Sequence, residues 1–295
     1  MPQASLAFVL HAHLPFVRHP AHEDFLEERW LAEAITETYI PLLEMLGALA
    51  RDRVPVRLTL SLSPPLLAML ADHLLRRRYL RHLDRLVELA EKEERRTRAD
   101  ERFHSVAEMY LARFWRARTI FLDEWGQDLI AAFRSFQERG LVEIITCAAT
   151  HGFLPLLAVT PGAVRAQIEV AVAEYRRFLG RTPEGFWLPE CAYEPGLDAE
   201  LARLGVRYFF VDTHGIAHAT PRPVYGVYAP VACDSGVAAF GRDPDSSKQV
   251  WSAEEGYPGD SWYRDFYRDI GFDLDYDYVR PYLPPTGQRI LTGLK

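Results

Sequence analysis

A small set of histidines and carboxylates in this 295-residue sequence follows short apolar runs, where β/α enzymes carry their catalytic groups. His11 and His13 stand two residues apart, so on a strand their side chains point to the same face. His151, Glu190 and Asp212 follow three further apolar runs. If the runs are parallel strands, their carboxyl ends meet, and we expect these five side chains to line one pocket.

The apolar runs alternate with helical patterns, which predicts an α/β fold with a parallel sheet covered by helices. The five predicted strands are Leu6 to Leu10, Val56 to Leu62, Val142 to Thr146, Gly185 to Leu188 and Val206 to Val211. The number of predicted strand-and-helix units favours a barrel. A strongly helical stretch at about 64–140 separates the second and third strands, and a turn-rich stretch at about 213–285 forms either a cleft lining or ordinary surface loops.

Two kinds of chemistry suit such a pocket. In glycoside chemistry a carboxylate attacks the anomeric carbon, and Glu190 is the best nucleophile because residues 187–189 before it (Trp-Leu-Pro) supply an apolar wall and a stiff backbone. In metal-assisted hydrolysis the His-x-His pair, a later histidine and an aspartate bind a metal, with His214 and His218 as further ligands. Asp212 either contacts the substrate, orients a histidine or caps a helix. Spacing alone leaves both mechanisms open.

Four segments together resemble a known family. They are HAHLP at 11–15, GLVEIITCAATHGFLPLL at 140–157, FWLPECAY at 186–193 and DSSKQVWSAEEGYPGD at 245–260. The first three are similar, in order and spacing, to the first three sequence regions of glycoside hydrolase family 57. The fourth resembles the corresponding stretch of that family's branching enzymes.

The resemblance implies an incomplete seven-stranded (β/α) barrel and a retaining mechanism without metal or cofactor, with Glu190 as nucleophile. The implied reaction cuts α-1,4 links of an amylose- or glycogen-type α-glucan and forms α-1,6 branches. By the same resemblance, His11, His13 and His151 hold the donor sugar, and the rings of Trp251 and Trp30 are platforms along the cleft.

The resemblance also leaves alternatives. An α-amylase-like hydrolase or a 4-α-glucanotransferase would use the same nucleophile, whereas a metal-dependent deacetylase or amidohydrolase, or an inactive glucan-binding remnant, would belong to another class. The family's acid/base is an aspartate in a fourth region, and none of the six aspartates within 260–277 has its context. We expect those six in solvated loops, residues 1–295 to be the N-terminal part of the barrel, and the acid/base region and a helical domain to lie outside.

Composition limits the partners. A net charge of −7 and a pI near 5.8 leave little to bind a phosphate backbone, so nucleic acid is an unexpected partner. The sequence has no signal peptide pattern and no apolar stretch approaching 18 residues, so we expect no membrane association. Three cysteines without a CxxC pair suit a reducing compartment, which predicts the cytoplasm.

Overall fold

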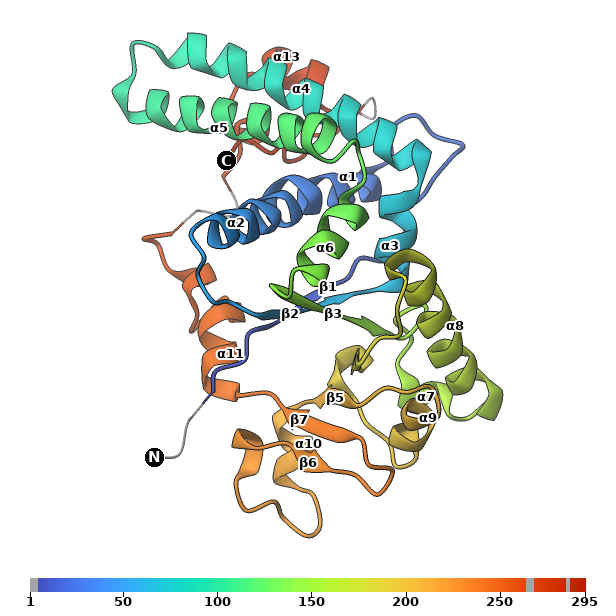
Figure 1. Ribbon diagram of the computed structural model, residues 1–295. Coiled ribbons are helices and arrows are strands. Elements are labelled where there is room, and N and C mark those ends of the chain that lie inside the picture. Colours follow the sequence, from blue (N-terminus) through green and yellow to red (C-terminus); the bar gives the residue numbers. More distant parts are fainter. Residues whose placement is uncertain (1–4, 264–267, 285–286) are drawn as a thin grey trace. The chain divides into compact units, whose positions relative to one another are not determined.

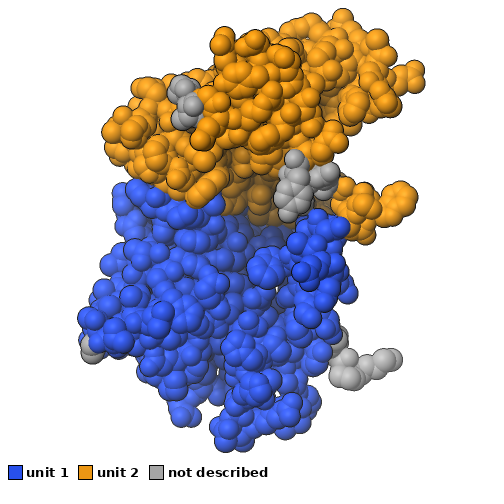
Figure 2. Space-filling view, turned by 180° about the vertical axis from the view of Figure 1, so that it is seen from behind, with its two compact units in different colours: residues 1–16, 54–68, 133–259 blue, residues 17–53, 69–132, 260–295 orange. Residues whose placement is uncertain are grey.

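A computed structural model of the protein describes residues 5–263, 268–284 and 287–295, which divide into two compact units (Figure 2). Unit 1 comprises the described residues of 1–16, 54–68 and 133–259. Unit 2 comprises those of 17–53, 69–132 and 260–295.

Unit 1 is built on a seven-stranded sheet in the order β1-β2-β3-β4-β5-β7-β6 (Figure 1). Neighbouring strands are parallel except for the antiparallel pair of β7 and β6. The strands are β1 (Val9–Ala12), β2 (Leu58–Leu62), β3 (Val142–Cys147), β4 (Gly185–Trp187), β5 (Tyr208–Val211), β6 (Val231–Ala232) and β7 (Ala238–Gly241). Within the described residues no pairing joins β1 to β6, so the sheet is open and the predicted α/β fold with an incomplete barrel is confirmed.

The five predicted strands are all present, although the first begins at Val9 rather than Leu6 and runs on to Ala12. In addition, β6 and β7 lie in the stretch that the sequence pattern described as turn-rich. Their sequences, Val-Ala and Ala-Ala-Phe-Gly, are too short and too poor in β-branched residues to give a strand signal. Pairing with β5 makes β7 a strand.

The core of unit 1 packs helices on the sheet through fully buried aliphatic and aromatic side chains, among them Ile168, Phe186 and Phe209. Gly185 has no room for a side chain, because a Cβ there would lie 2.4 Å from the Tyr208 ring. The helices and helical turns of this unit outside 64–140 are α7 (Leu154–Leu157), α8 (Pro161–Leu179), η3 (Pro189–Cys191), α9 (Leu197–Arg203), α10 (Thr213–Ala217), η4 (Gly226–Tyr228), α11 (Pro244–Trp251) and η5 (Tyr257–Gly259).

The stretch between β2 and β3 is helical, as predicted. It contains α3 (Pro64–Ala71), α4 (His73–Thr97), α5 (Glu101–Thr119), the π-helical turn η2 (Ile120–Glu124) and α6 (Leu129–Glu138). Asp72 caps α4 by accepting hydrogen bonds from the backbone N–H groups of Leu74 and Leu75. The Tyr79 and Phe121 rings pack edge to face at 4.7 Å and join α4 to η2.

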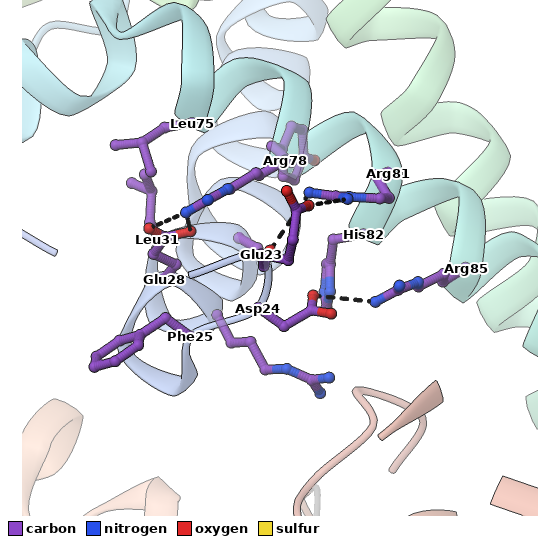
Figure 3. Close-up of a pocket in the computed structure, with 13 residues that line it drawn as sticks. Glu23, Asp24, Phe25, Glu28, Leu31, Leu75, Arg78, Arg81, His82 and Arg85 are labelled. Carbon is purple, nitrogen blue, oxygen red and sulfur yellow. Dashed lines mark hydrogen bonds and ion pairs between the residues drawn. The ribbon is translucent and has the colours of Figure 1, made fainter. Parts of the chain in front are cut away.

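Unit 2 combines α4, α5 and η2 with helices from both ends of the chain. These are α1 (Leu26–Ala34), η1 (Ile35–Tyr39), α2 (Ile40–Arg51), α12 (Ile270–Asp273), α13 (Tyr276–Val279) and η6 (Arg280–Tyr282). A nearly buried ion pair, in which Arg78 donates to both oxygens of Glu28, joins α4 to α1 (Figure 3). The adjacent cavity of about 40 Å³ has room for a few water molecules and is lined by two further ion pairs, Arg81 with Glu23 and Arg85 with Asp24.

Asp269 corrects one prediction. It belongs to the six aspartates expected in solvated loops, but it is 1% exposed. Its carboxylate accepts hydrogen bonds from the backbone N–H groups of Gly271, Thr292 and Gly293 and from the Thr292 hydroxyl. Polar density in the sequence cannot separate a loop aspartate in water from one that binds buried backbone donors. Asp265, another of the six, lies outside the described residues.

Candidate active site

Three histidines gather at the carboxyl ends of β1 and β3 in unit 1. His11 Nε2 lies 2.9 Å from His151 Nε2, and the His13 and His151 rings stack at 3.8 Å. The Trp187 ring, at the end of β4, stacks on His11 at 4.6 Å with an interplanar angle of 9°. The structure therefore brings His11, His13 and His151 together as predicted, against an aromatic wall.

Two serines, Ser61 in β2 and Ser63 directly after it, orient these rings, and the sequence analysis missed both as site residues. His11 Nδ1 lies 3.0 Å from Ser61 Oγ, and His13 Nδ1 lies 3.0 Å from Ser63 Oγ. His11 is paired with Ser61 in the register of the parallel sheet, and two residues further along both strands the second pair forms. The alternation of Ser61 and Ser63 matches that of the histidines, so a correct strand register would have found them.

The histidine cluster is neutral at pH 7. Burial, followed by the neighbouring histidines, lowers the pKa of His11 to about 3. Burial and then His151 lower the pKa of His13 to about 4. The 2.9 Å contact between His11 and His151 agrees, because one of the two Nε2 atoms must be unprotonated to accept. Neutral imidazoles of this kind both donate to and accept from hydroxyl groups.

These pKa values predict acid sensitivity. Between pH 6.5 and pH 4 an unfolded chain protonates His11 and the folded chain does not, so the free energy of unfolding should fall as the pH falls. The expected slope for one such histidine is up to about 1.4 kcal/mol per pH unit. Urea unfolding from pH 7 to pH 4 should show a shallower dependence for His11→Gln than for wild type. The exposed His214 is the control, and equal slopes for wild type, His11→Gln and His214→Gln would contradict the lowered pKa.

Glu190 sits on a strained turn directly after β4. Its side chain is exposed, and its backbone is left-handed at φ 55° and ψ 21°, as is that of Cys191 at φ 53°. His151, at φ 56°, shares this conformation, so three of the five non-glycine residues with positive φ in the described part of the chain lie here. Each costs about 1–3 kcal/mol, and such strain concentrates at functional sites. The charge of Glu190 raises the pKa of His151 against the larger effect of burial, so the carboxylate acts electrostatically on this histidine.

Cys191 and Asp212 contact each other next to the Glu190 turn. Burial raises the pKa of the Cys191 thiol to about 11, so the thiol is protonated and packed at neutral pH. The Asp212 side chain accepts from the Thr213 backbone N–H at 2.6 Å and caps α10, while its own N–H donates to Cys191 O at 3.3 Å. Asp212 is thus a helix cap beside the pocket, and its contact with substrate remains a prediction.

The remaining predicted positions are all exposed to solvent. Trp251, at the end of α11, is 82% exposed, and Trp30 on α1 of unit 2 is 44% exposed; their role as platforms remains a prediction. His214 and His218 are exposed on α10 and at its end. Across residues 5–263, 268–284 and 287–295, no three His, Cys, Asp or Glu side chains are grouped as metal ligands would be.

A second cavity lies at the other edge of the sheet. It measures about 650 Å³ and is lined by Glu143, Tyr208, Phe240 and neighbours near the amino ends of β3, β5 and β7. Tyr208 donates to Glu143 at 2.6 Å inside it. Active sites of β/α barrels lie at the carboxyl ends of the strands, so the histidine cluster and Glu190, rather than this cavity, form the candidate site.

The site combines an exposed carboxylate on a strained turn with a neutral histidine cluster and an aromatic wall, an arrangement suited to a neutral polyhydroxyl substrate. A model of glycosyl hydrolase family 57 matches residues 7–270, which include every one of these groups. The chain belongs to this family. The family assignment made from the four sequence segments is therefore confirmed.

Two branching enzymes and one alpha-amylase are similar to this chain. The 1,4-alpha-glucan branching enzyme of Thermococcus kodakarensis is 36% identical over 289 residues, which cover 89% of this chain and 42% of that protein. The crystal structure of the alpha-amylase AmyC from Thermotoga maritima is 48% identical with a TM-score of 0.93, covering 99% of this chain and 56% of that one. The GH57-type branching enzyme from Pyrococcus horikoshii is 34% identical with a TM-score of 0.81, covering 90% and 51%. This chain spans about half the length of these relatives.

Proposed function

We propose that this chain carries the nucleophile and donor-sugar site of a 1,4-α-glucan branching enzyme. The observation that carries the proposal is the position of Glu190, exposed on a left-handed turn after the carboxyl end of β4, where its charge acts on His151. The identity of 36% to a curated branching enzyme, over 89% of the chain, supports the choice of reaction.

In the proposed mechanism Glu190 attacks the anomeric carbon of a glucan held by the histidines. The bond from that carbon to the leaving oxygen breaks and an ester to Glu190 forms. A separate general acid protonates the leaving oxygen. A 6-hydroxyl group of an acceptor glucan then attacks the ester, which releases the carboxylate and retains the α configuration. We assign the acid to no residue of this chain.

A specific observation favours a second candidate, α-amylase-like hydrolysis. The structure with 48% identity and a TM-score of 0.93 is named an alpha-amylase. The same pocket would serve both reactions, because hydrolysis differs only in that water, rather than a 6-hydroxyl group, attacks the glycosyl-enzyme ester.

Product analysis on amylose separates the candidates, since transfer conserves the number of glycosidic links and hydrolysis does not. With the complete natural protein, branching should form α-1,6 links, detected as new short chains after debranching, with almost no gain in reducing ends. A gain in reducing ends without α-1,6 links would establish the hydrolase instead. Altered chain lengths with neither change would indicate a 4-α-glucanotransferase.

We expect no stoichiometric transition metal in the active protein, because a carboxylate mechanism needs none. Both ring nitrogens of His11 already contact Ser61 and His151. Elemental analysis and a chelator test are the measurements. About one equivalent of zinc or manganese, with activity lost to the chelator and restored by the metal, would favour the metal-dependent deacetylase or amidohydrolase.

We also propose the compartment and the partners of the enzyme. No helix in the described residues is long and apolar enough to cross a bilayer. The cysteine pattern supports a cytoplasmic enzyme, the acidic charge balance argues against nucleic-acid binding, and the similarity to a branching enzyme supports a glycogen-type glucan as substrate.

A further inference from the structure

The two serines beside the histidine cluster are fully buried, and Ser61 and Ser63 are each 0% exposed. A buried hydroxyl group needs an acceptor for its hydrogen, because a buried donor without a partner destabilises the fold. Within the part of the chain that the structure describes, the only hydrogen-bond partner of Ser61 Oγ is Nδ1 of His11, at 3.0 Å. The Ser61 hydroxyl group therefore donates to His11 Nδ1.

Ser63 reaches the same arrangement with the help of the helix that follows it. Its oxygen accepts from the backbone N–H of Leu66 at 3.4 Å, in the first turn of α3, so one of its lone pairs is already used. Among the described residues, the hydroxyl hydrogen then has one acceptor, Nδ1 of His13 at 3.0 Å. Ser63 thus accepts from the helix and donates to the histidine.

These two donated hydrogens decide where the histidine rings carry their own. A neutral imidazole has one ring hydrogen, and burial keeps His11 and His13 neutral by lowering their pKa values to about 3 and about 4. When Nδ1 accepts, that hydrogen is on Nε2. His11 Nε2–H therefore donates to His151 Nε2 at 2.9 Å, and His151, which accepts there, carries its hydrogen on Nδ1.

A separate contact of His151 agrees with this direction. Burial lowers the pKa of His151, whereas the charge of Glu190 and a hydrogen bond to its own backbone raise it. Nδ1 is the ring nitrogen nearer to the backbone of the same residue, so Nδ1 is the donor of that bond and Nε2 is left to accept. Stacking on Trp187 at 4.6 Å and of His13 on His151 at 3.8 Å holds the ring planes.

We propose that Ser61 and Ser63 are positioning residues that fix the tautomers of the histidine cluster, so that the cluster offers a glucan one imidazole N–H, at Nε2 of His13. In the described part of the chain this nitrogen has no hydrogen-bond partner, whereas the ring hydrogens of His11 and His151 are already used. The sugar oxygen that meets His13 must then be an acceptor. The role toward a glucan rests on the proposed function, and the tautomers do not.

The serines matter because a histidine without a fixed donor at Nδ1 can carry its hydrogen on either nitrogen. In the molecules with the hydrogen of His13 on Nδ1, Nε2 would present a lone pair to the sugar oxygen, and the hydrogen bond would be replaced by repulsion between two lone pairs. Preorganised donors avoid this loss because no rearrangement is needed when the substrate binds.

The test reads the tautomers directly in the complete natural protein, with nitrogen-15 confined to histidine. Two-bond nitrogen–proton correlations distinguish a ring nitrogen with a hydrogen from one without, and His11→Gln, His13→Gln and His151→Gln assign the signals. For the wild type at pH 7 we expect the hydrogen on Nε2 in His11 and His13 and on Nδ1 in His151. A histidine in water carries it mostly on Nε2, so the result for His151 is the discriminating one.

Ser61→Ala and Ser63→Ala remove the fixed donors. We expect Ser61→Ala to mix the tautomers of His11 and His151, and Ser63→Ala to mix those of His13. Each should lower kcat/KM for glucan transfer about tenfold, because the histidines lose their fixed hydrogen-bond directions. A purely structural role of the serines would change stability and leave the tautomers as they are.

Thr146→Val is the matched control. It removes another fully buried hydroxyl group from the same sheet, on β3. Its Oγ1 donates to Cys147 O at 3.4 Å and contacts no histidine among the described residues. The histidine spectrum and kcat/KM of this variant should match those of the wild type.

The outcomes separate this inference from the function itself. A ring hydrogen on Nδ1 of His11 or His13 in the wild type overturns the inference, and so do wild-type tautomers in both alanine variants. If an alanine variant does not fold, the wild-type spectrum still decides, because it needs no serine substitution. A fluorinated α-glucosyl donor that traps the ester tests the function separately: a label on a residue other than Glu190 overturns the nucleophile, whereas the tautomers depend only on the spectra.

Discussion

Replacing Glu190 by glutamine in the complete natural protein is expected to reduce glucan transfer by on the order of 10⁴-fold or more. The amide keeps the size and shape of the side chain, but it cannot form the glycosyl ester on which the second half of the reaction depends. The measurement is the rate of α-1,6 link formation, together with peptide mapping of a fluorinated-donor label, which should appear on FWLPECAY in the wild type and be absent from the variant.

The matched control for this variant is Glu184→Gln. Glu184 lies in the same unit, directly before the amino end of β4, whereas Glu190 follows its carboxyl end. Its side chain forms an ion pair with Arg207. It should retain nearly full activity. Activity of Glu190→Gln within about tenfold of the control would assign the nucleophile to a different residue.

Replacing Asp269 by alanine is expected to lower the free energy of unfolding by about 3 kcal/mol, because three backbone N–H groups and a hydroxyl would lose a buried, charged acceptor. The segment 292–294 would then be held to α12 by fewer hydrogen bonds, chiefly that from Ile270 N–H to Leu294 O, and should open more often. Urea unfolding measures the loss, and faster amide exchange at residues 292–294 locates it.

The control is the exposed Asp277, for which Asp277→Ala should change stability by less than about 0.5 kcal/mol. Equal stability of the two variants would mean that water replaces the Asp269 carboxylate without cost. If Asp269→Ala instead abolished transfer in a fully stable protein, Asp269 would belong to the catalytic machinery rather than to the fold.

Local pattern predicted the parts of the site that depend on a single segment. His11 and His13 share a face because side chains alternate along a strand, and β1, β3, β4 and β5 end next to polar residues because parallel strands share one carboxyl edge. These rules need no knowledge of distant contacts. The same reasoning failed for β7, which becomes a strand because β5 lies beside it rather than because Ala-Ala-Phe-Gly favours extension.

The sequence by itself determined the family, the parallel α/β fold and the residues that gather at the strand ends, because all three follow from short-range periodicity and segment order. Only the tertiary structure decided which groups complete the site. Ser61 and Ser63 meet the histidines through strand register, and Asp269 is buried by a segment more than twenty residues away. Each of these partnerships joins residues distant in the chain, and the free energy that selects such pairs arises when the segments pack and exclude water.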